Sequence, residues 1–326
     1  MRSGRAFAVS ATLAVAASLA FASSASADPS PQSRDIVGAG SDTSEVVVQN
    51  LADGAGVGAG FLPGYNGTAN ARLVSFNATG TTPIVLKAGT AAVTRPNGSG
   101  AGKSALYGAT NNPSINFARS SSGPSSAENA AGLWHVPFAL DTVRVATATT
   151  SNAPASLTAV QLVGIYNGTI TNWSQVGGSS GVIVPMIPQA NSGTRNFFLA
   201  QLQAANGGTA ISLAASVQSV QEHDSAPLSA NANAVGPFSV ARFNTDSSGI
   251  KLAGGFSADR ALYNVVRNAD RSAPWFSALF GPDGFVCSGG GLALVQAAGF
   301  QQLAGPFDGG VCGVATQTAT TNFSVN

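Results

Sequence analysis

Short apolar runs rich in β-branched residues alternate along the chain with longer segments rich in alanine and leucine. The short runs predict β-strands at 36–37, 73–76, 143–147 and 182–187. The longer segments predict helices at 157–166 and 196–205. Because strands and helices alternate in this way, the pattern predicts an α/β fold.

Polar residues stand where the predicted helices begin. Ser192 precedes the apolar run 197–199, Ser156 precedes Leu157, and Ser41 or Asp42 precedes the valines at 46–48. Serine and aspartate side chains at these positions accept hydrogen bonds from the first free backbone N–H groups of a helix. The serines therefore mark predicted helix starts, and Asn-Gly pairs between the segments mark turns.

The first 27 residues have the three parts of a secretory signal peptide. Arg2 and Arg5 form a basic start, residues 6–22 are apolar, and Ala25-Ser26-Ala27 is a small-residue cleavage site. The alternative, a membrane anchor, is disfavoured because the apolar stretch falls short of the ~20 residues that span a bilayer. No cysteine near the cleavage point offers a lipid anchor. We therefore expect a secreted protein without a stable membrane anchor.

The composition is poor in charge for a chain of this length. Of 326 residues, 44% are hydrophobic and 9% are charged, with 15 Lys and Arg against 14 Asp and Glu. This balance excludes a highly charged disordered tail and a basic nucleic-acid-binding protein. We expect no nucleic-acid partner and a surface of small polar side chains.

The chain from residue 28 onward is longer than one hydrophobic core usually supports, so the length predicts two lobes. Cys287 and Cys312 are the only cysteines. In an oxidising compartment such a pair predicts one disulfide. A redox pair or a metal thiolate site is the alternative, but the C-x-x-C spacing typical of those sites is missing.

Three motifs resemble catalytic or metal-binding signatures without fulfilling them. The glycine-rich segment 98–104 ends in Lys-Ser but has Asn97 where a P-loop needs glycine. The segment 177–181 reads G-x-S-x-G but precedes a strand rather than a helix. Glu222-His223-Asp224 are adjacent in a loop, where three side chains rarely face one ion. We therefore expect no metal, no cofactor and no catalytic residues.

The strongest local pattern is the strand 182–187 followed by a turn and a new helix. Ser192, Gly193 and Thr194 supply two hydroxyl groups, a position for close backbone approach and free N–H groups at the helix start. Such a helix N-terminus attracts anions. These residues therefore predict either an anion site or simply a helix cap.

Five segments in this order resemble the phosphate-binding proteins of bacterial ABC phosphate importers. The segments are 38–43, 98–102, 116–121, 157–173 and 192–194. The resemblance implies a two-lobed periplasmic-binding-protein-like fold of type II, with the ligand held between the lobes. One lobe is expected to combine residues 28–142 and 236–326, and the other to comprise 143–235.

The same resemblance implies a monomeric, non-enzymatic binding protein that captures phosphate or another small oxyanion and serves an ABC permease. The candidate ligand-binding residues lie in four groups. They are Ser41, Asp42 and Thr43; Ser99; Arg119, Ser120 and Ser121; and Ser192, Gly193, Thr194 and Arg195.

Three positions depart from the pattern of the family. Asp42 replaces a threonine, Ser121 replaces an acidic proton acceptor, and Pro188 replaces an arginine. An oxyanion beside the buried Asp42 then requires a new cation, which Arg119 or Arg195 could supply. Asp42 would accept the proton of the ligand or hold Arg119.

Other interpretations stay open on the sequence alone. Asp42 and Arg119 could form a plain salt bridge in a site for a different ligand. That ligand could be an organic acid or a sugar phosphate, and an extracellular hydrolase is the third interpretation.

Overall fold

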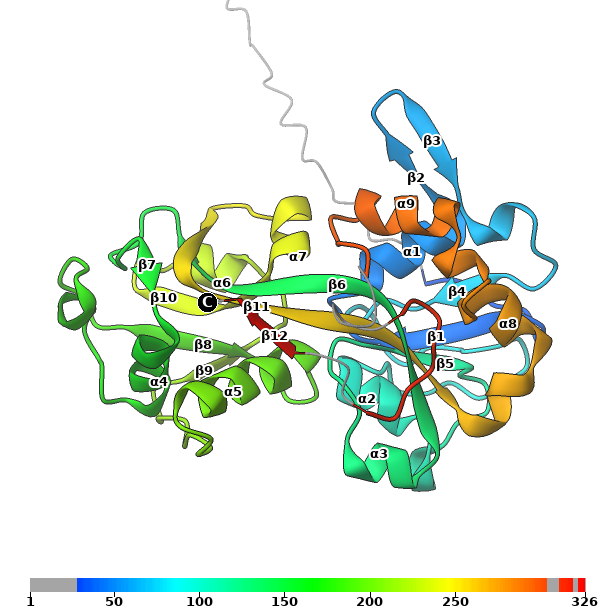
Figure 1. Ribbon diagram of the computed structural model, residues 1–326, viewed down its shortest axis with the longest axis horizontal. Helices are drawn as coiled ribbons and strands as arrows, with labels where there is room; N and C mark the ends of the chain where they lie inside the picture. The colour runs from blue at the N-terminus through cyan, green and yellow to red at the C-terminus, as the bar shows by residue number, and fades with distance from the viewer. Residues whose placement is uncertain (1–27, 304–310, 319–321, 326) are drawn as a thin grey trace, which may run out of the picture.

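The computed structural model describes residues 28–303, 311–318 and 322–325. The predicted signal peptide, residues 1–27, lies outside the described residues. The chain forms two lobes of mixed α/β structure that share one large twisted sheet (Figure 1).

The sheet has a parallel set of strands in each lobe and an antiparallel pair between the two sets. In spatial order its strands are β4 (Leu73–Ser75), β1 (Ile36–Gly40), β5 (Phe117–Ser120), β11 (Ile250–Arg267), β6 (Leu133–Ala148), β10 (Ala234–Ser239), β8 (Val184–Pro188) and β9 (Gln218–Val220). Strands β4, β1 and β5 are parallel, and so are β10, β8 and β9. Two short strands, β7 (Ser156–Leu157) and β12 (Asn322–Val325), also pair with β11.

Helices cover the sheet in both lobes. The first lobe carries α1 (Glu45–Asp53), α2 (Ser99–Ser104), α3 (Ser126–Ala130), α8 (Pro274–Phe280) and α9 (Gly289–Ala297). The second lobe carries α4 (Ala159–Asn167), α5 (Gly193–Ala205) and α6 (Ala226–Ser229), and α7 (Val240–Thr245) follows β10. A hairpin of β2 (Gly54–Val57) and β3 (Gly60–Pro63) projects from the first lobe (Figure 1).

The long strands β6 and β11 run through both lobes (Figure 1), and each lobe has its own hydrophobic core. Phe117 and Ala139 lie in a core of the first lobe, and Val143 and Phe198 lie in a core of the second. Phe256, beyond the predicted lobe boundary at 235, also packs in the second core. The difference arises because the first half of β11 pairs with β6 inside the second lobe.

Most predicted elements appear with shifted ends. The predicted strand at 182–187 is β8, and Ser192 caps α5 by accepting a hydrogen bond from the backbone N–H of Arg195 at 3.0 Å. The predicted cap Ser156 instead lies in β7, and Thr158 caps α4. The first helix likewise begins after Ser44 rather than after Ser41 or Asp42.

The segment 98–104 is not a phosphate loop. Lys103 is buried within α2, and its ammonium group lies 2.8 Å from Glu128 Oε1 and 3.1 Å from Ser122 Oγ. Because the lysine is paired inside the lobe, it is not available to a nucleotide.

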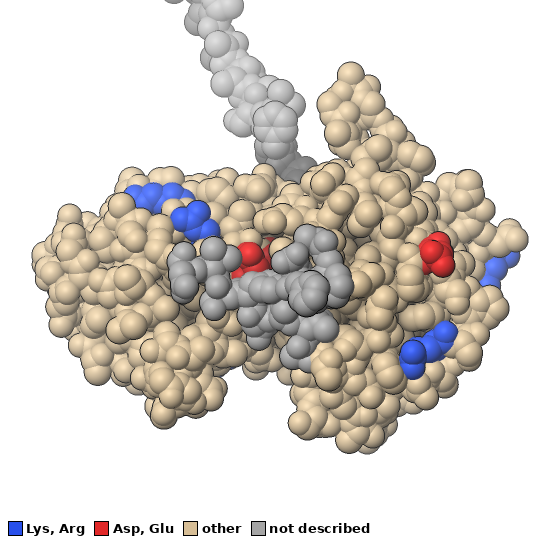
Figure 2. All heavy atoms as spheres, in the orientation of Figure 1, with Lys and Arg blue, Asp and Glu red and all other residues tan. Residues whose placement is uncertain are grey.

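Charged side chains are sparse and scattered on the face shown in Figure 2.

No single helix among the described residues is both long enough and apolar enough to cross a membrane. The bent helix pair 274–287 and 289–297 reaches that length and apolar character only when its two parts are taken together.

Cys287 and Cys312 are bonded, as the sequence predicts. The bond ties the short turn before α9 to the segment 311–318.

We expect replacement of both cysteines by alanine to lower the free energy of unfolding by roughly 3 kcal/mol, because the unfolded chain loses a constraint across 25 residues. Urea denaturation of the variant and of oxidised wild type, both without reductant, measures the difference in free energy of unfolding. Wild-type protein denatured with reductant serves as the control. A loss below about 1 kcal/mol would contradict the expectation.

Candidate functional site

The candidate site lies where loops from both lobes meet. Strands β1 and β5 of the first lobe end at the loop 41–44 and at Ser121. Strands β8 and β9 of the second lobe lead into the turn 189–192 and into the loop that carries Glu222. In open α/β sheets, ligands bind beyond the carboxyl ends of parallel strands. The fold therefore brings the predicted segments together at the position where this rule places a ligand.

Five buried hydroxyl groups from both lobes form the centre of the site. Ser121 Oγ lies 3.1 Å from Ser41 Oγ, 3.3 Å from Thr43 Oγ1 and 3.3 Å from Ser99 Oγ. Thr43 Oγ1 also lies 3.2 Å from Thr194 Oγ1 of the second lobe. We call Ser41, Thr43, Ser99, Ser121 and Thr194 the hydroxyl cluster.

Gly193 allows the start of α5 to approach the hydroxyl cluster. A Cβ atom at this position would lie 2.3 Å from Ser121 Oγ and 2.4 Å from Ser99 Oγ. Any larger residue at Gly193 would therefore force Ser99 and Ser121 to shift. Ser192, the cap of this helix, is itself buried and uses its side chain on the backbone N–H of Arg195.

Arg260 of β11 is the cation of the site. Its Nη2 donates to Thr194 Oγ1 at 2.8 Å and to Thr43 Oγ1 at 3.2 Å. The same side chain donates to Asp141 Oδ2 through Nε at 3.0 Å and Nη2 at 2.8 Å. Burial raises the pKa of Asp141 while Arg260 and Ser239 oppose the rise. Arg260 thus reaches both threonines while a buried carboxylate fixes its orientation.

Neither predicted arginine donates to a hydroxyl group of the cluster, which differs from the sequence expectation. Arg119 is fully buried and donates to backbone oxygens, at 3.0 Å to Ser41 and at 2.6 Å to Phe76. Arg195 donates to the backbone oxygen of Pro188 at 2.9 Å. Nearby carbonyl groups therefore engage both side chains. Through its hydrogen bond to the backbone oxygen of Ser41, Arg119 stabilises the loop 41–44.

Asp42 and Ser120 also have other partners than the hydroxyl cluster. Asp42 Oδ1 lies 3.6 Å from Arg242 Nη2, and this pair replaces the expected pair with Arg119. Burial raises the pKa of Asp42 to about 8, with Arg242 opposing and Glu222 adding to the rise. Ser120 Oγ donates to the backbone oxygen of Ser122 at 2.8 Å.

Glu222 and His223 extend the site on the side of the second lobe. Glu222 Oε1 lies 3.1 Å from Thr43 Oγ1 and accepts from the backbone N–H of Thr194 at 3.2 Å. His223 Nε2 lies 3.0 Å from Thr43 Oγ1. Burial, together with nearby Arg242 and Arg260, holds the pKa of His223 well below its usual range, so the ring is neutral.

These two residues do not form a metal site with their neighbour. Glu222 and His223 are buried, whereas Asp224 is exposed, so the three side chains do not converge. Across the described ranges of the chain, no group of three or more His, Cys, Asp or Glu residues could hold a metal ion.

The sequence motif 222–224 drew attention to these residues only as metal-ligand candidates. No sequence motif predicts a role for Arg260, and the only sign of it is the charged pair Asp259-Arg260 inside a run that otherwise favours a strand.

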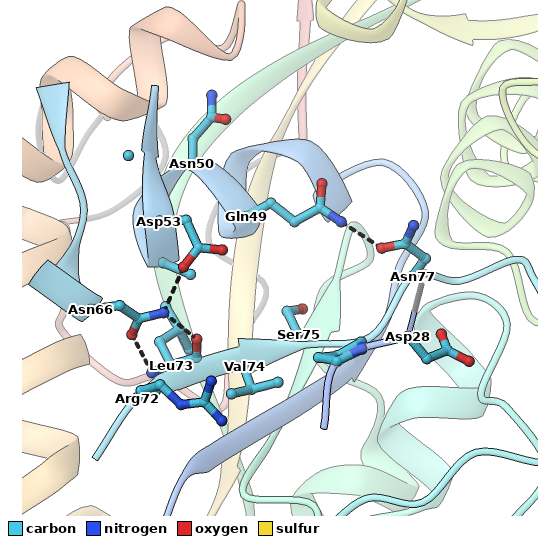
Figure 3. A pocket seen from close by; sticks show the side chains of 13 residues that line it. Asp28, Gln49, Asn50, Asp53, Asn66, Arg72, Leu73, Val74, Ser75 and Asn77 are labelled. Carbon is cyan, nitrogen blue, oxygen red and sulfur yellow. Dashed lines mark hydrogen bonds between the residues drawn. The ribbon is translucent and has the colours of Figure 1, made fainter. Parts of the chain in front are cut away.

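A separate cavity of about 450 Å³ lies between α1 and β4 of the first lobe (Figure 3). Its polar side chains bond to one another, Gln49 to Asn77 and Asn66 to Asp53. Ser75 on its wall is a hydrogen-bond partner of Arg119. Because the residues of the hydroxyl cluster do not line it, this cavity is distinct from the candidate site.

The chain matches the model of the PBP superfamily domain over residues 25–258. No curated protein matches the chain.

Among solved structures, a Clostridium perfringens protein crystallised with bound phosphate is 19% identical, with a TM-score of 0.57, over 82% of this chain and 99% of that chain. An ABC-type phosphate transport receptor from Vibrio cholerae is 21% identical, with a TM-score of 0.55, over 82% of this chain and 100% of that chain. A phosphate-binding protein from Stenotrophomonas maltophilia is 17% identical, with a TM-score of 0.52, over 83% of this chain and 91% of that chain. At these identities the likeness concerns the fold.

Proposed function

Because the chain belongs to the PBP superfamily, we propose that it is a solute-binding protein that captures a small oxyanion, above all phosphate, between its two lobes. The observation that carries this proposal is the convergence of hydrogen-bond donors from both lobes. The hydroxyl cluster, the backbone N–H of Thr194 and the Arg260 guanidinium meet within one buried site.

These donors suit an oxyanion for a physical reason. Hydroxyl groups and the N–H groups of a helix start replace the hydration shell of an anion with fixed dipoles. Arg260 adds a charged donor with a planar fork that matches two oxygens of one ligand. Since Asp141 balances the charge of Arg260, the dipoles must provide much of the stabilisation.

The structural neighbours support the choice of phosphate among oxyanions. The Clostridium perfringens neighbour holds phosphate, and the Vibrio cholerae neighbour is a phosphate transport receptor. We extend the proposal to a monomeric protein that acts outside the cell and delivers its ligand to an ABC permease. No covalent chemistry is part of this role.

The proposal predicts that ligand-stripped protein binds phosphate or arsenate in calorimetric titration, with sulfate as the comparison. Thr194→Val keeps the shape of the side chain but removes its hydroxyl group, so it is expected to weaken phosphate binding about tenfold. Thr209→Val, at an exposed position, is the matched control and is expected to bind as the wild type does.

Failure of every oxyanion to bind at millimolar concentration would refute the proposal. Tight binding of a small organic acid or a sugar phosphate instead would establish the alternative ligand class.

A further inference from the structure

The carboxylate of Glu222 occupies the donors that an oxyanion would need. Oε1 of Glu222 accepts the N–H of Thr194, near the start of the 13-residue helix α5, at 3.2 Å. The same oxygen lies 3.1 Å from the hydroxyl oxygen of Thr43 in the opposite lobe. A carboxylate oxygen therefore links the two lobes from within the site.

Two further observations indicate that the fold places the Glu222 carboxylate in the site specifically. The Glu222 side chain has no exposed surface, and its other oxygen, Oε2, has no hydrogen-bond partner among the described residues. The next residue, His223, has a φ of 56°, a left-handed conformation that is strained for a residue with a side chain. The chain thus directs a buried carboxylate into the site at a cost in backbone strain.

We propose that Glu222 is an intramolecular ligand, which occupies the oxyanion site and which a soluble oxyanion must displace. This inference rests on the proposed function. The N–H of Thr194 and the hydroxyl of Thr43 each carry one hydrogen, so neither can serve Glu222 and a ligand fully at once. The ligand would also meet a like charge in a buried site, which disfavours binding further.

The consequence is a binding protein whose affinity is set by its own glutamate. Removing the charge of Glu222 weakens its hold on Thr194, because hydrogen bonds to charged groups are stronger than those between neutral groups. Glutamine keeps the length of the side chain and can still accept the Thr194 N–H through its amide oxygen. Glu222→Gln is therefore expected to fold and to bind oxyanions more tightly.

The test is calorimetric titration of wild type, Glu222→Gln and Asp224→Asn with phosphate and with sulfate. Glu222→Gln is expected to bind both anions at least about tenfold more tightly than wild type. Asp224→Asn removes the same charge from an exposed side chain two residues away, so it is expected to match wild type. Glu222→Asp, which keeps the charge on a shorter side chain, is expected to lie between wild type and Glu222→Gln.

Each alternative outcome is decisive. If Glu222→Gln binds phosphate more weakly while wild type binds it, Glu222 contacts the bound ligand and the inference is overturned. Equal affinity of wild type and Glu222→Gln overturns it as well. If neither wild type nor any variant binds an oxyanion although all unfold cooperatively, the proposed function itself fails, whereas binding by wild type together with tighter binding by Glu222→Gln supports both proposals.

Discussion

Replacing Asp141 with alanine is expected to lower the free energy of unfolding by about 3–5 kcal/mol, because the Arg260 guanidinium stays buried without its carboxylate. Arg260 is 1% exposed and makes two hydrogen bonds to Asp141, at 2.8 and 3.0 Å. Ser239, which donates to the other oxygen of Asp141, loses its partner too. Urea denaturation of the purified variant measures the loss.

The matched control replaces both members of the pair, as Asp141→Leu with Arg260→Met. Removing two opposite buried charges together avoids an unpaired charge, so this double variant is expected to recover most of the lost stability. The affinity of the double variant for phosphate is nevertheless expected to fall at least about thirtyfold, because methionine at position 260 cannot donate a hydrogen bond to Thr194 as Arg260 does. Equal stability of the single variant and wild type would show that the buried pair is not required for stability.

Asp42 is expected to make the protein less stable as the pH rises from about 4 to about 8. The carboxyl group stays protonated in the folded protein up to its pKa of about 8, but in the unfolded chain it ionises near the ordinary aspartate pKa of 3.8. Over this window the folded state binds the extra proton, so stability falls by at most about 1.4 kcal/mol per pH unit. The groups that face Asp42 are Arg242 of α7, Arg119 of β5, Glu45 of α1 and Glu222.

Asp42→Asn removes this ionisation and keeps the shape of the side chain. The variant is expected to match wild type near pH 4 and to become increasingly more stable than wild type toward pH 8. Chemical denaturation at a series of pH values measures the difference. Asp283→Asn, at an exposed position, is the control, and a difference for Asp42→Asn that does not change with pH would contradict the assignment.

The sequence predicts the local elements of this fold better than it predicts the long strands. The apolar run at 182–187 and the cap at Ser192 are local signals, and both appear in β8 and α5. Strand β11 was not predicted, because Gly254 and Gly255 interrupt its apolar pattern. The register of β11 with β6 shifts at this point, between Leu252 and Ser257.

The same limit applies to the site. Thr194 follows the predicted strand at 182–187, and Ser121 lies in segment 116–121, which resembles the family, so local sequence signals can identify both. The role of Arg260 depends instead on the register of β11 against β6, which places Arg260 opposite Asp141. No local pattern encodes that pairing. Arg119 was a reasonable expectation from its place in the chain, but its side chain donates to the backbone oxygens of Ser41 and Phe76.

The pairing of β6 with β11 also has a consequence for how the chain folds. It joins Leu133 to Arg267 and Ala148 to Ile250, residues separated by long stretches of chain that include most of the second lobe. Closing such long loops costs entropy before any contact is gained, and non-local pairing of this kind slows folding. Until Ile250–Arg267 is in place, β5 and β6 each lack a neighbouring strand. Neither lobe can therefore complete its sheet before the last quarter of the chain has joined it.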